Sequence, residues 1–321
     1  MNRIAASLVA FALLVPLASA QTYPAKPVRI IVPAQPGGGL DLIGRTMADQ
    51  LGRALEQTFI VENQGGAGGS IACQTVARAA PDGYTLMVGY VATHATSPAV
   101  RKVPYDPVRD FTPVAMIGGT RNMLVVHPSL PVSDARGFTA YAREQGGKLK
   151  HGAGGIGTLT HLLMEQLKAA AGFDVVTAQY RGIGPAFQDM LGGQLDVMTP
   201  GLAAALPHIR SGKVKPLAVT GVARHPLLPD VPTFQESGFG GFDGVQWYGI
   251  VGPAKLNPEV TRKLSTEIGK ALASPELQQR LVAEAIEPMP MSPREFGAYI
   301  EAELARYTAL ARERKIWLED K

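Results

Sequence analysis

Two glycine-rich loops carry the residues with the clearest chemical potential. The first, Ala34 to Asp41, reads AQPGGGLD and follows the apolar run Val28 to Val32. The second, Gly152 to Gly157, has the spacing G-x-G-x-x-G and precedes a helical pattern that starts near Leu159. Glycines expose backbone N–H groups, and a helix N-terminus adds partial positive charge. Each loop therefore predicts a site for an anionic group such as a carboxylate or a phosphate.

Polar side chains near these loops supply further candidate contacts. Thr93 and His94 follow the predicted strand Tyr84 to Val88 on its carboxyl side, where open α/β sheets bind ligands. Arg181 follows another predicted strand, and its guanidinium fork matches a carboxylate. Each has a plainer alternative: His94 as a loop histidine in water, and Arg181 as a surface cation or a salt bridge between lobes. His161, one turn into a helix, either lines a cleft or satisfies local backbone groups, and both readings stay open.

The second loop also matches the fingerprint of a dinucleotide site, because Asp174 lies about twenty residues further on. The polar segment Leu149 to His151 is a poor strand, which weakens this oxidoreductase alternative. Signatures of serine hydrolases, zincins and β-lactamases are missing. No two histidines have metal-ligand spacing on one helix face, and Cys73 is the only cysteine, so no internal disulfide can form. We therefore expect no catalytic residue, no metal and no cofactor.

Alternating strand and helix patterns must position these loops. Val28 to Val32, Phe59 to Glu62 and Tyr84 to Val88 predict three strands with helices between them, and a second unit of this kind starts at Leu149. Two similar α/β halves predict two lobes facing one cleft, with C-terminal helices returning to the first lobe. The predicted boundaries are 21–122 and 246–321 for the first lobe and 123–245 for the second.

Several local signals make sharper predictions. Asp41 is expected to cap the first helix. The pair Gly118-Gly119 is expected to separate a strand over Val114 to Ile117 from one over Met123 to Val126. Cys73 is expected to pack as a small apolar residue. Trp247 and Tyr248 lie near the second chain crossing, where core or hinge packing explains them.

The N-terminus has the three parts of a secretory signal. Arg3 gives a positive start, Ile4 to Leu17 is mostly apolar, and Ala18-Ser19-Ala20 fits the cleavage rule. Cleavage after Ala20 would leave a periplasmic chain without a membrane anchor. The formal charge would fall from +4 to +3, since 30 basic residues face 27 acidic ones once Arg3 is removed. This mild charge, without a clustered basic stripe, makes nucleic acid an unexpected partner.

An ordered set of short motifs gives the chain its resemblance to a family. The motifs are Tyr23-Pro24-Ala25-Lys26-Pro27-Val28-Arg29, Val32-Pro33-Ala34-Gln35-Pro36-Gly37-Gly38-Gly39-Leu40-Asp41, Val61-Glu62-Asn63, Gly66-Ala67-Gly68-Gly69, Pro81-Asp82-Gly83-Tyr84-Thr85-Leu86, Tyr105-Asp106-Pro107, Asp110-Phe111-Thr112-Pro113, Leu191-Gly192-Gly193-Gln194, Leu217-Ala218-Val219-Thr220 and Leu228-Pro229-Asp230-Val231-Pro232-Thr233. In this order, over essentially the whole mature chain, they resemble the receptors of tripartite tricarboxylate transporters, the Bug proteins.

The resemblance implies a type II-like, two-lobed periplasmic binding protein that closes on a small carboxylate and works with membrane permease subunits. It also implies that the loop Ala34 to Gly38 reaches the ligand largely through water, whereas Gly154 to Thr158 grips one carboxylate with backbone donors. We expect a monomer. The candidate ligand-binding residues, from the motifs and the resemblance together, are Ala34, Gln35, Pro36, Gly37, Gly38, Asp41, Thr93, His94, Gly154, Gly155, Ile156, Gly157, Thr158, His161, Tyr180, Arg181, Gly182 and Thr199.

Two departures from the family pattern narrow the expected ligand. The family commonly has an aromatic residue at Ala34 or Gln35, and this chain has none there. The family often has an acidic residue near Thr199-Pro200-Gly201, and it is absent here. A ligand amino group would lack an anionic partner, so we expect an amine-free di- or tricarboxylate or an aromatic acid. The alternatives are a binding protein that feeds a sensor kinase and, from another class, the oxidoreductase.

Overall fold

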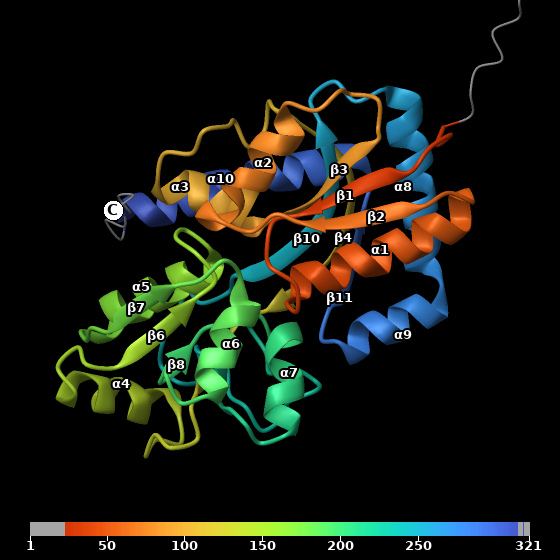
Figure 1. Ribbon diagram of the computed structural model, residues 1–321. Helices are drawn as coiled ribbons and strands as arrows, with labels where there is room; N and C mark the ends of the chain where they lie inside the picture. Colours follow the sequence, from red (N-terminus) through yellow and green to blue (C-terminus); the bar gives the residue numbers. More distant parts are fainter. Residues whose placement is uncertain (1–22, 314–316, 318–321) are drawn as a thin grey trace, which may run out of the picture.

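The computed structural model describes residues 23–313 and 317, and its strands form two sheets, one in each lobe (Figure 1). The six-stranded sheet has the order β11-β4-β10-β3-β1-β2. Its strands are β1 (Val28–Val32), β2 (Phe59–Asn63), β3 (Thr85–Tyr90), β4 (Phe111–Arg121), β10 (Val245–Pro253) and β11 (Glu287–Met291). The five-stranded sheet has the order β7-β6-β8-β5-β9. Its strands are β5 (Met123–Val126), β6 (Lys150–Ala153), β7 (Val176–Gln179), β8 (Val197–Met198) and β9 (Lys215–Val219).

Helices cover both sheets (Figure 1). The first lobe has α1 (Gly39–Leu55), α2 (Ser70–Ala77), α3 (Ser97–Val100), α8 (Pro258–Ala273), α9 (Pro275–Ala283) and α10 (Pro293–Glu313), together with the short turns η1 (Ala67–Gly69) and η2 (Ala92–Thr96). The second lobe has α4 (Ala135–Glu144), α5 (Leu159–Ala171), α6 (Ile183–Leu191) and α7 (Leu202–Arg210). None of these helices is long and apolar enough to cross a membrane. The predicted signal peptide lies outside the described residues.

The chain passes between the lobes at two points. β4 ends at Arg121, and β5 begins at Met123 in the other sheet. Asn122, between them, is fully buried; its backbone N–H donates to Thr220 Oγ1 at 3.0 Å, and its side-chain amide donates to the Thr199 carbonyl at 3.0 Å. The return enters the first sheet with β10. The two crossings lie side by side, because Arg121 at the end of β4 pairs with Val245 at the start of β10. We call β10 the hinge strand.

Strand β4 differs from the sequence prediction. It runs without a break through Gly118 and Gly119, which were expected to end a strand. A Cβ on Gly118 would lie 2.5 Å from the Glu287 carbonyl oxygen, and one on Gly119 would lie 2.4 Å from a methyl group of Val245. The glycines therefore let two neighbouring strands approach closely, which is a property of the sheet and not of a turn.

The core contains the aromatic residues that lie near the second crossing. Trp247 and Tyr248 are fully buried in β10, and Trp247 packs edge-to-face against Phe296 of α10. Cys73 is also fully buried. The contact between Trp247 and Phe296 therefore joins β10 to α10 inside the molecule.

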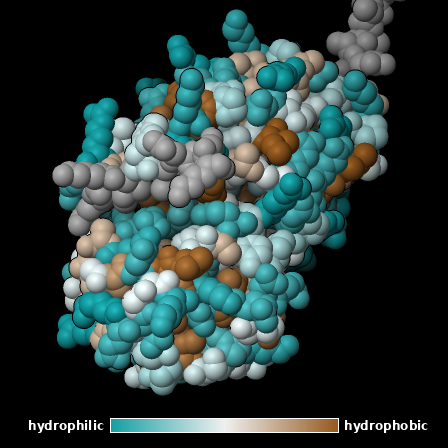
Figure 2. Space-filling model, turned by 60° about the vertical axis from the view of Figure 1, so that its left-hand side comes forward, coloured by the Kyte–Doolittle hydropathy of each residue, from teal (hydrophilic) through white to brown (hydrophobic). Residues whose placement is uncertain are grey.

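On the face shown in Figure 2, hydrophobic residues form small separate spots on a largely hydrophilic surface.

Candidate ligand-binding site

A small cavity of about 40 Å³ lies between the two lobes. The first lobe and the hinge strand contribute Pro33, Ala34, Gln35, Gly38, Gly39, Leu40, Tyr90 and Gln246, and the second lobe contributes Gly154, Thr158, Thr160, Gly182 and Ile183. None of these lining residues carries a charged side chain. An ion held here would therefore interact with backbone dipoles, hydroxyls and amides.

Three helices begin at this cavity. The N-cap residues of α1, α5 and α6 are Gly38, Thr158 and Gly182, and all three line it. No described side chain accepts a cap hydrogen bond at these helix starts. The first N–H groups of a helix have no intrahelical acceptor and carry partial positive charge. Three such termini give the cavity a positive partial charge that favours an anion.

The carboxylate of Asp41 stabilises the first loop by hydrogen bonds. It accepts from the Gly37 N–H at 3.2 Å, from Asn63 Nδ2 at 3.0 Å and from Arg45 Nε at 3.1 Å. Burial raises the pKa of Asp41, but the hydrogen bonds from Arg45, Asn63 and Gly37 outweigh it, so the net pKa is lowered. The prediction that Asp41 is the N-cap is wrong, because α1 starts at Gly39 and Gly38 is its N-cap.

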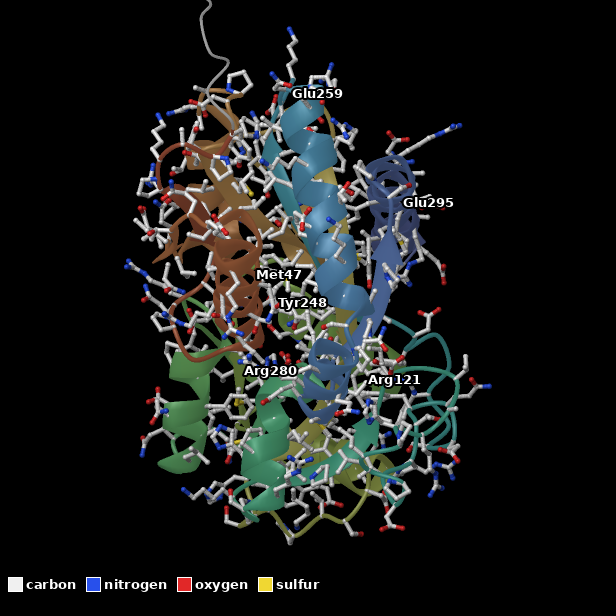
Figure 3. All side chains as sticks on the ribbon, turned by 90° about the vertical axis from the view of Figure 1, so that its right-hand side faces the viewer. Met47, Arg121, Tyr248, Glu259, Arg280 and Glu295 are labelled. Carbon is white, nitrogen blue, oxygen red and sulfur yellow. The ribbon has the colours of Figure 1, made fainter. Side chains whose placement is uncertain are left out.

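A close approach explains one glycine of the first loop. A Cβ on Gly39 would lie 2.9 Å from the hydroxyl of Tyr248, which accepts a 2.7 Å hydrogen bond from Gln246 Nε2. Figure 3 labels Tyr248 at the level where the two lobes meet. The hinge strand therefore packs against the start of α1 through Tyr248 and contributes Gln246 to the cavity.

The hydroxyl groups of the second loop bond to each other and to the loop backbone. Thr158 Oγ1 donates to the Gly155 carbonyl at 2.7 Å. Since this bond uses its hydrogen, the 2.7 Å contact between Thr158 and Thr160 must have Thr160 as the donor. Thr160 Oγ1 also accepts from the Gly154 N–H at 2.9 Å. Both hydroxyl hydrogens are therefore used inside the loop, and Thr158 must rotate its O–H before it can donate to a ligand.

A buried hydrogen-bond chain supports this loop from the core of the second lobe. Thr199 Oγ1 donates to the Thr160 carbonyl and lies 3.2 Å from His151 Nε2, so His151 carries its proton on Nε2. Its Nδ1 lies 3.3 Å from Thr177 Oγ1. Burial, followed by the neighbouring charge of His161, lowers the pKa of His151 to about 3. Thr199, a predicted ligand contact, thus lies behind the loop rather than on the cavity wall.

His94 and Thr93 lie in the core of the first lobe. The structure continues β3 into the π-helical turn η2, where a loop was expected. The His94 ring is fully buried and packs against Phe111, with a centroid separation of 4.8 Å. Its Nδ1 lies 2.8 Å from Thr93 Oγ1, and its Nε2 has no partner among the described residues. Burial lowers the pKa of His94 to about 3, so the imidazole is neutral.

The remaining predicted polar side chains have partners outside the cavity. His161 Nδ1 accepts from the Gly157 N–H at 3.4 Å, and its Nε2 lies 3.6 Å from Glu165. The Tyr180 hydroxyl donates to Asp189 at 2.5 Å. The Arg181 side chain is exposed, and its backbone carbonyl accepts from the Gln35 N–H of the first lobe at 3.0 Å.

The predicted residues thus fall into two groups. Ala34, Gln35, Gly38, Gly154, Thr158 and Gly182 line the cavity. Pro36, Gly37, Asp41, Thr93, His94, Gly155, Ile156, Gly157, His161, Tyr180, Arg181 and Thr199 do not line it. Gln246 was not predicted, and no sequence signal marks it, because β10 enters the site from far along the chain. Ile183 directly follows Gly182, and the start of α6 was the available signal.

Comparison with known proteins agrees with this architecture. The family described as "Tripartite tricarboxylate transporter family receptor" matches residues 43–316. Protein BugT of Bordetella pertussis is 32% identical over 301 residues, covering 92% of this chain and 91% of BugT.

Solved structures of similar proteins have the same fold. R. palustris Rpa4515 with adipate has a TM-score of 0.89 at 32% identity, covering 92% of this chain and 99% of Rpa4515. MatC (Rpa3494) from Rhodopseudomonas palustris with bound malate has a TM-score of 0.86 at 31% identity, covering 89% of this chain and 99% of MatC. The predicted two-lobed α/β binding-protein fold is therefore confirmed. The chain belongs to the receptor family of tripartite tricarboxylate transporters, whose members are binding proteins and not enzymes.

Proposed function

We propose that this protein is an extracytoplasmic receptor that closes its lobes around a small, amine-free carboxylate and delivers it to a permease of the tripartite type. The single observation that carries this proposal is a cavity without charged side chains at which three helices begin. Two similar receptors, Rpa4515 and MatC, were solved with the carboxylates adipate and malate. Such a cavity suits a carboxylate because backbone N–H groups supply directed donors.

The same cavity disfavours an ammonium group. No acidic side chain lines it, and the carboxylate of Asp41 is already bonded to Arg45 and Asn63. A buried cation without an anionic partner is costly. Exclusion of amino acids therefore follows from the lack of a counter-charge.

The oxidoreductase alternative for the second loop is wrong, because the chain belongs to a family of receptors.

Isothermal calorimetry on the mature chain with matched acids tests the proposal. Malate has a hydroxyl on the carbon that carries the amine in aspartate, so this pair isolates the effect of the amine. We expect malate, succinate or adipate to bind and aspartate and glutamate to fail. Binding of aspartate as tight as that of malate would refute the exclusion of amines, and silence from every carboxylate would refute the ligand class.

The proposed location is the periplasm, with cleavage after Ala20. Its support is the tripartite signal pattern at residues 1–20 together with the family. Amino-terminal sequencing of the exported protein should start at Gln21, and a chain that retains Arg3 would contradict this.

A further inference from the structure

The two lobes meet along a line of close backbone contacts beside the cavity, which we call the closure seam. Its first-lobe residues are Gln35, Gly68, Thr96 and Ser97, and its second-lobe residues are Gly155, Ile156, Gly157 and Arg181. A Cβ on Gly68 would lie 2.5 Å from the Ile156 carbonyl oxygen, and one on Gly157 would lie 2.9 Å from the Ser97 Cα. The backbones of the two lobes therefore approach closely along the seam, with the Ser97 side chain packed between them.

Thr96 makes a side-chain hydrogen bond across this seam. It is the last residue of η2 in the first lobe and is fully buried. Its Oγ1 donates to the Gly157 carbonyl of the second lobe at 2.7 Å, between residues 61 positions apart in the sequence. Because a buried carbonyl without a hydrogen-bond partner is costly, this bond stabilises the arrangement in which the lobes are closed.

The accepting carbonyl belongs to the peptide group that leads into the ligand loop. Gly157 has a φ of +74°, and its N–H donates to His161 Nδ1 at 3.4 Å. The next N–H along the chain, that of Thr158, donates to the Gly155 carbonyl at 3.2 Å. The hydrogen bond from Thr96 therefore holds the peptide from which Thr158, the N-cap of α5, enters the cavity.

We propose that Thr96 is a positioning residue that couples lobe closure to the anion-binding loop. Its hydrogen bond exists only when the lobes are together, and it orients the Gly157–Thr158 peptide at that moment. Closure and ligand capture then stabilise each other as two parts of one equilibrium. This inference rests on the proposed function, because it concerns the same cavity and its ligand.

Three variants separate the hydroxyl from the shape of the side chain. Thr96→Val keeps the shape and removes the donor, so the Gly157 carbonyl is buried without a partner in the closed form but can bond to water in the open form. Thr96→Ser keeps the donor. Thr139→Val is the matched control, because Thr139 is also buried and donates to a carbonyl, that of Arg136 at 3.0 Å, within α4 of the second lobe alone.

Spin labels report closure independently of affinity. Ile71 in α2 and Val176 in β7 are 49% and 59% exposed and lie on different lobes, so Ile71→Cys and Val176→Cys supply the label sites. The native Cys73 is fully buried and stays unlabelled. Pulsed electron spin resonance on the mature chain, with malate and adipate as probes, gives the fraction of closed molecules.

We expect Thr96→Val to weaken binding about tenfold and to lower the closed fraction at a fixed probe concentration. Thr96→Ser and Thr139→Val should stay within about twofold of the parent, and urea unfolding of the ligand-free variants should not follow this ranking. Unchanged closure in Thr96→Val, or an equal loss in Thr139→Val, would overturn the inference and leave the proposed function intact. A parent chain that binds neither probe in the calorimeter and stays open with both would overturn the two together.

Discussion

Replacing Gly184 by alanine should weaken ligand binding while making the second lobe more stable. Gly184 lies in the first turn of α6 at an ordinary helical φ, and a Cβ there would lie 2.9 Å from the Pro36 carbonyl oxygen across the cleft. This is its nearest contact. The lobes must separate by about 0.5 Å to bring the two atoms to an ordinary van der Waals distance.

The size of the effect follows from the hydrogen bonds that the separation stretches. The Gln35 N–H donates to the Arg181 carbonyl at 3.0 Å, and Thr96 donates to Gly157 at 2.7 Å. Each bond contributes about 0.5–1.5 kcal/mol, so weakening both costs the closed form about 1–2 kcal/mol. We expect affinity to fall about tenfold. Alanine in place of glycine at a compatible helical position stabilises the fold by about 0.4–1 kcal/mol.

Calorimetry and urea unfolding of the ligand-free protein measure the two opposite effects. The control is Gly192→Ala at the other end of the same helix, where the nearest atom to the new Cβ would be the Gln188 carbonyl oxygen at 3.4 Å. This control should leave affinity unchanged. Parent-like affinity in Gly184→Ala would refute the idea that the lobes close this tightly, and a loss of both affinity and stability would show local damage instead.

Three further predictions concern the ligand loop and the buried side chains. Thr158→Val should weaken binding of the acid selected by the calorimetric panel 10-fold or more, since bonds to charged groups contribute about 1.5–3 kcal/mol, and Thr158→Ser should restore it; equal affinities would contradict a role for the hydroxyl. Burial holds the pKa of His94 and of His151 at about 3, below the unfolded value, so the unfolded chain binds more protons between about pH 6.5 and 3. The free energy of unfolding, measured in urea, should therefore decrease as the pH is lowered through that range, by up to about 1.4 kcal/mol per pH unit for each histidine. His94→Leu should flatten this slope, and a free energy of unfolding that stays level from pH 7 to 5 would contradict the prediction. Burial raises the pKa of the Cys73 thiol to about 12, so Ellman's reagent should react with it only after urea unfolding, and rapid reaction in the native protein would contradict its burial.

Local sequence patterns identified the parts of the site that depend on neighbouring residues. Glycines after a strand predicted exposed N–H groups at both loops, and the structure places Gly38 and Gly154 on the cavity wall. Ser292 and Glu295 have the spacing of a capping box in the sequence, and at the start of α10 the Glu295 carboxylate accepts from the Ser292 N–H at 2.8 Å. These features need only a few adjacent residues, because turns and helix starts form from local hydrogen bonds.

Side-chain roles could not be read in the same way. His94 and Arg181 have residue types suited to a carboxylate site, yet the His94 ring packs in the core and Arg181 contributes its backbone carbonyl to the lobe interface. Gln246 enters the cavity from a strand on which no motif drew attention to it. Burial and direction depend on which distant segments pack together, and residue type alone does not carry that information.

The sequence by itself determined the family, the two glycine loops and the strand–helix alternation, since motif order and periodicity are properties of the linear chain. Only the tertiary structure decided that Asp41 braces a loop, that the hydroxyl hydrogens of Thr158 and Thr160 are already used, and that Thr96 reaches Gly157 across the closure seam. The physical reason is that each of these facts is a direction or a distance of a few ångströms. Folding sets such quantities between residues that the sequence keeps far apart, or between groups whose orientation depends on their partners.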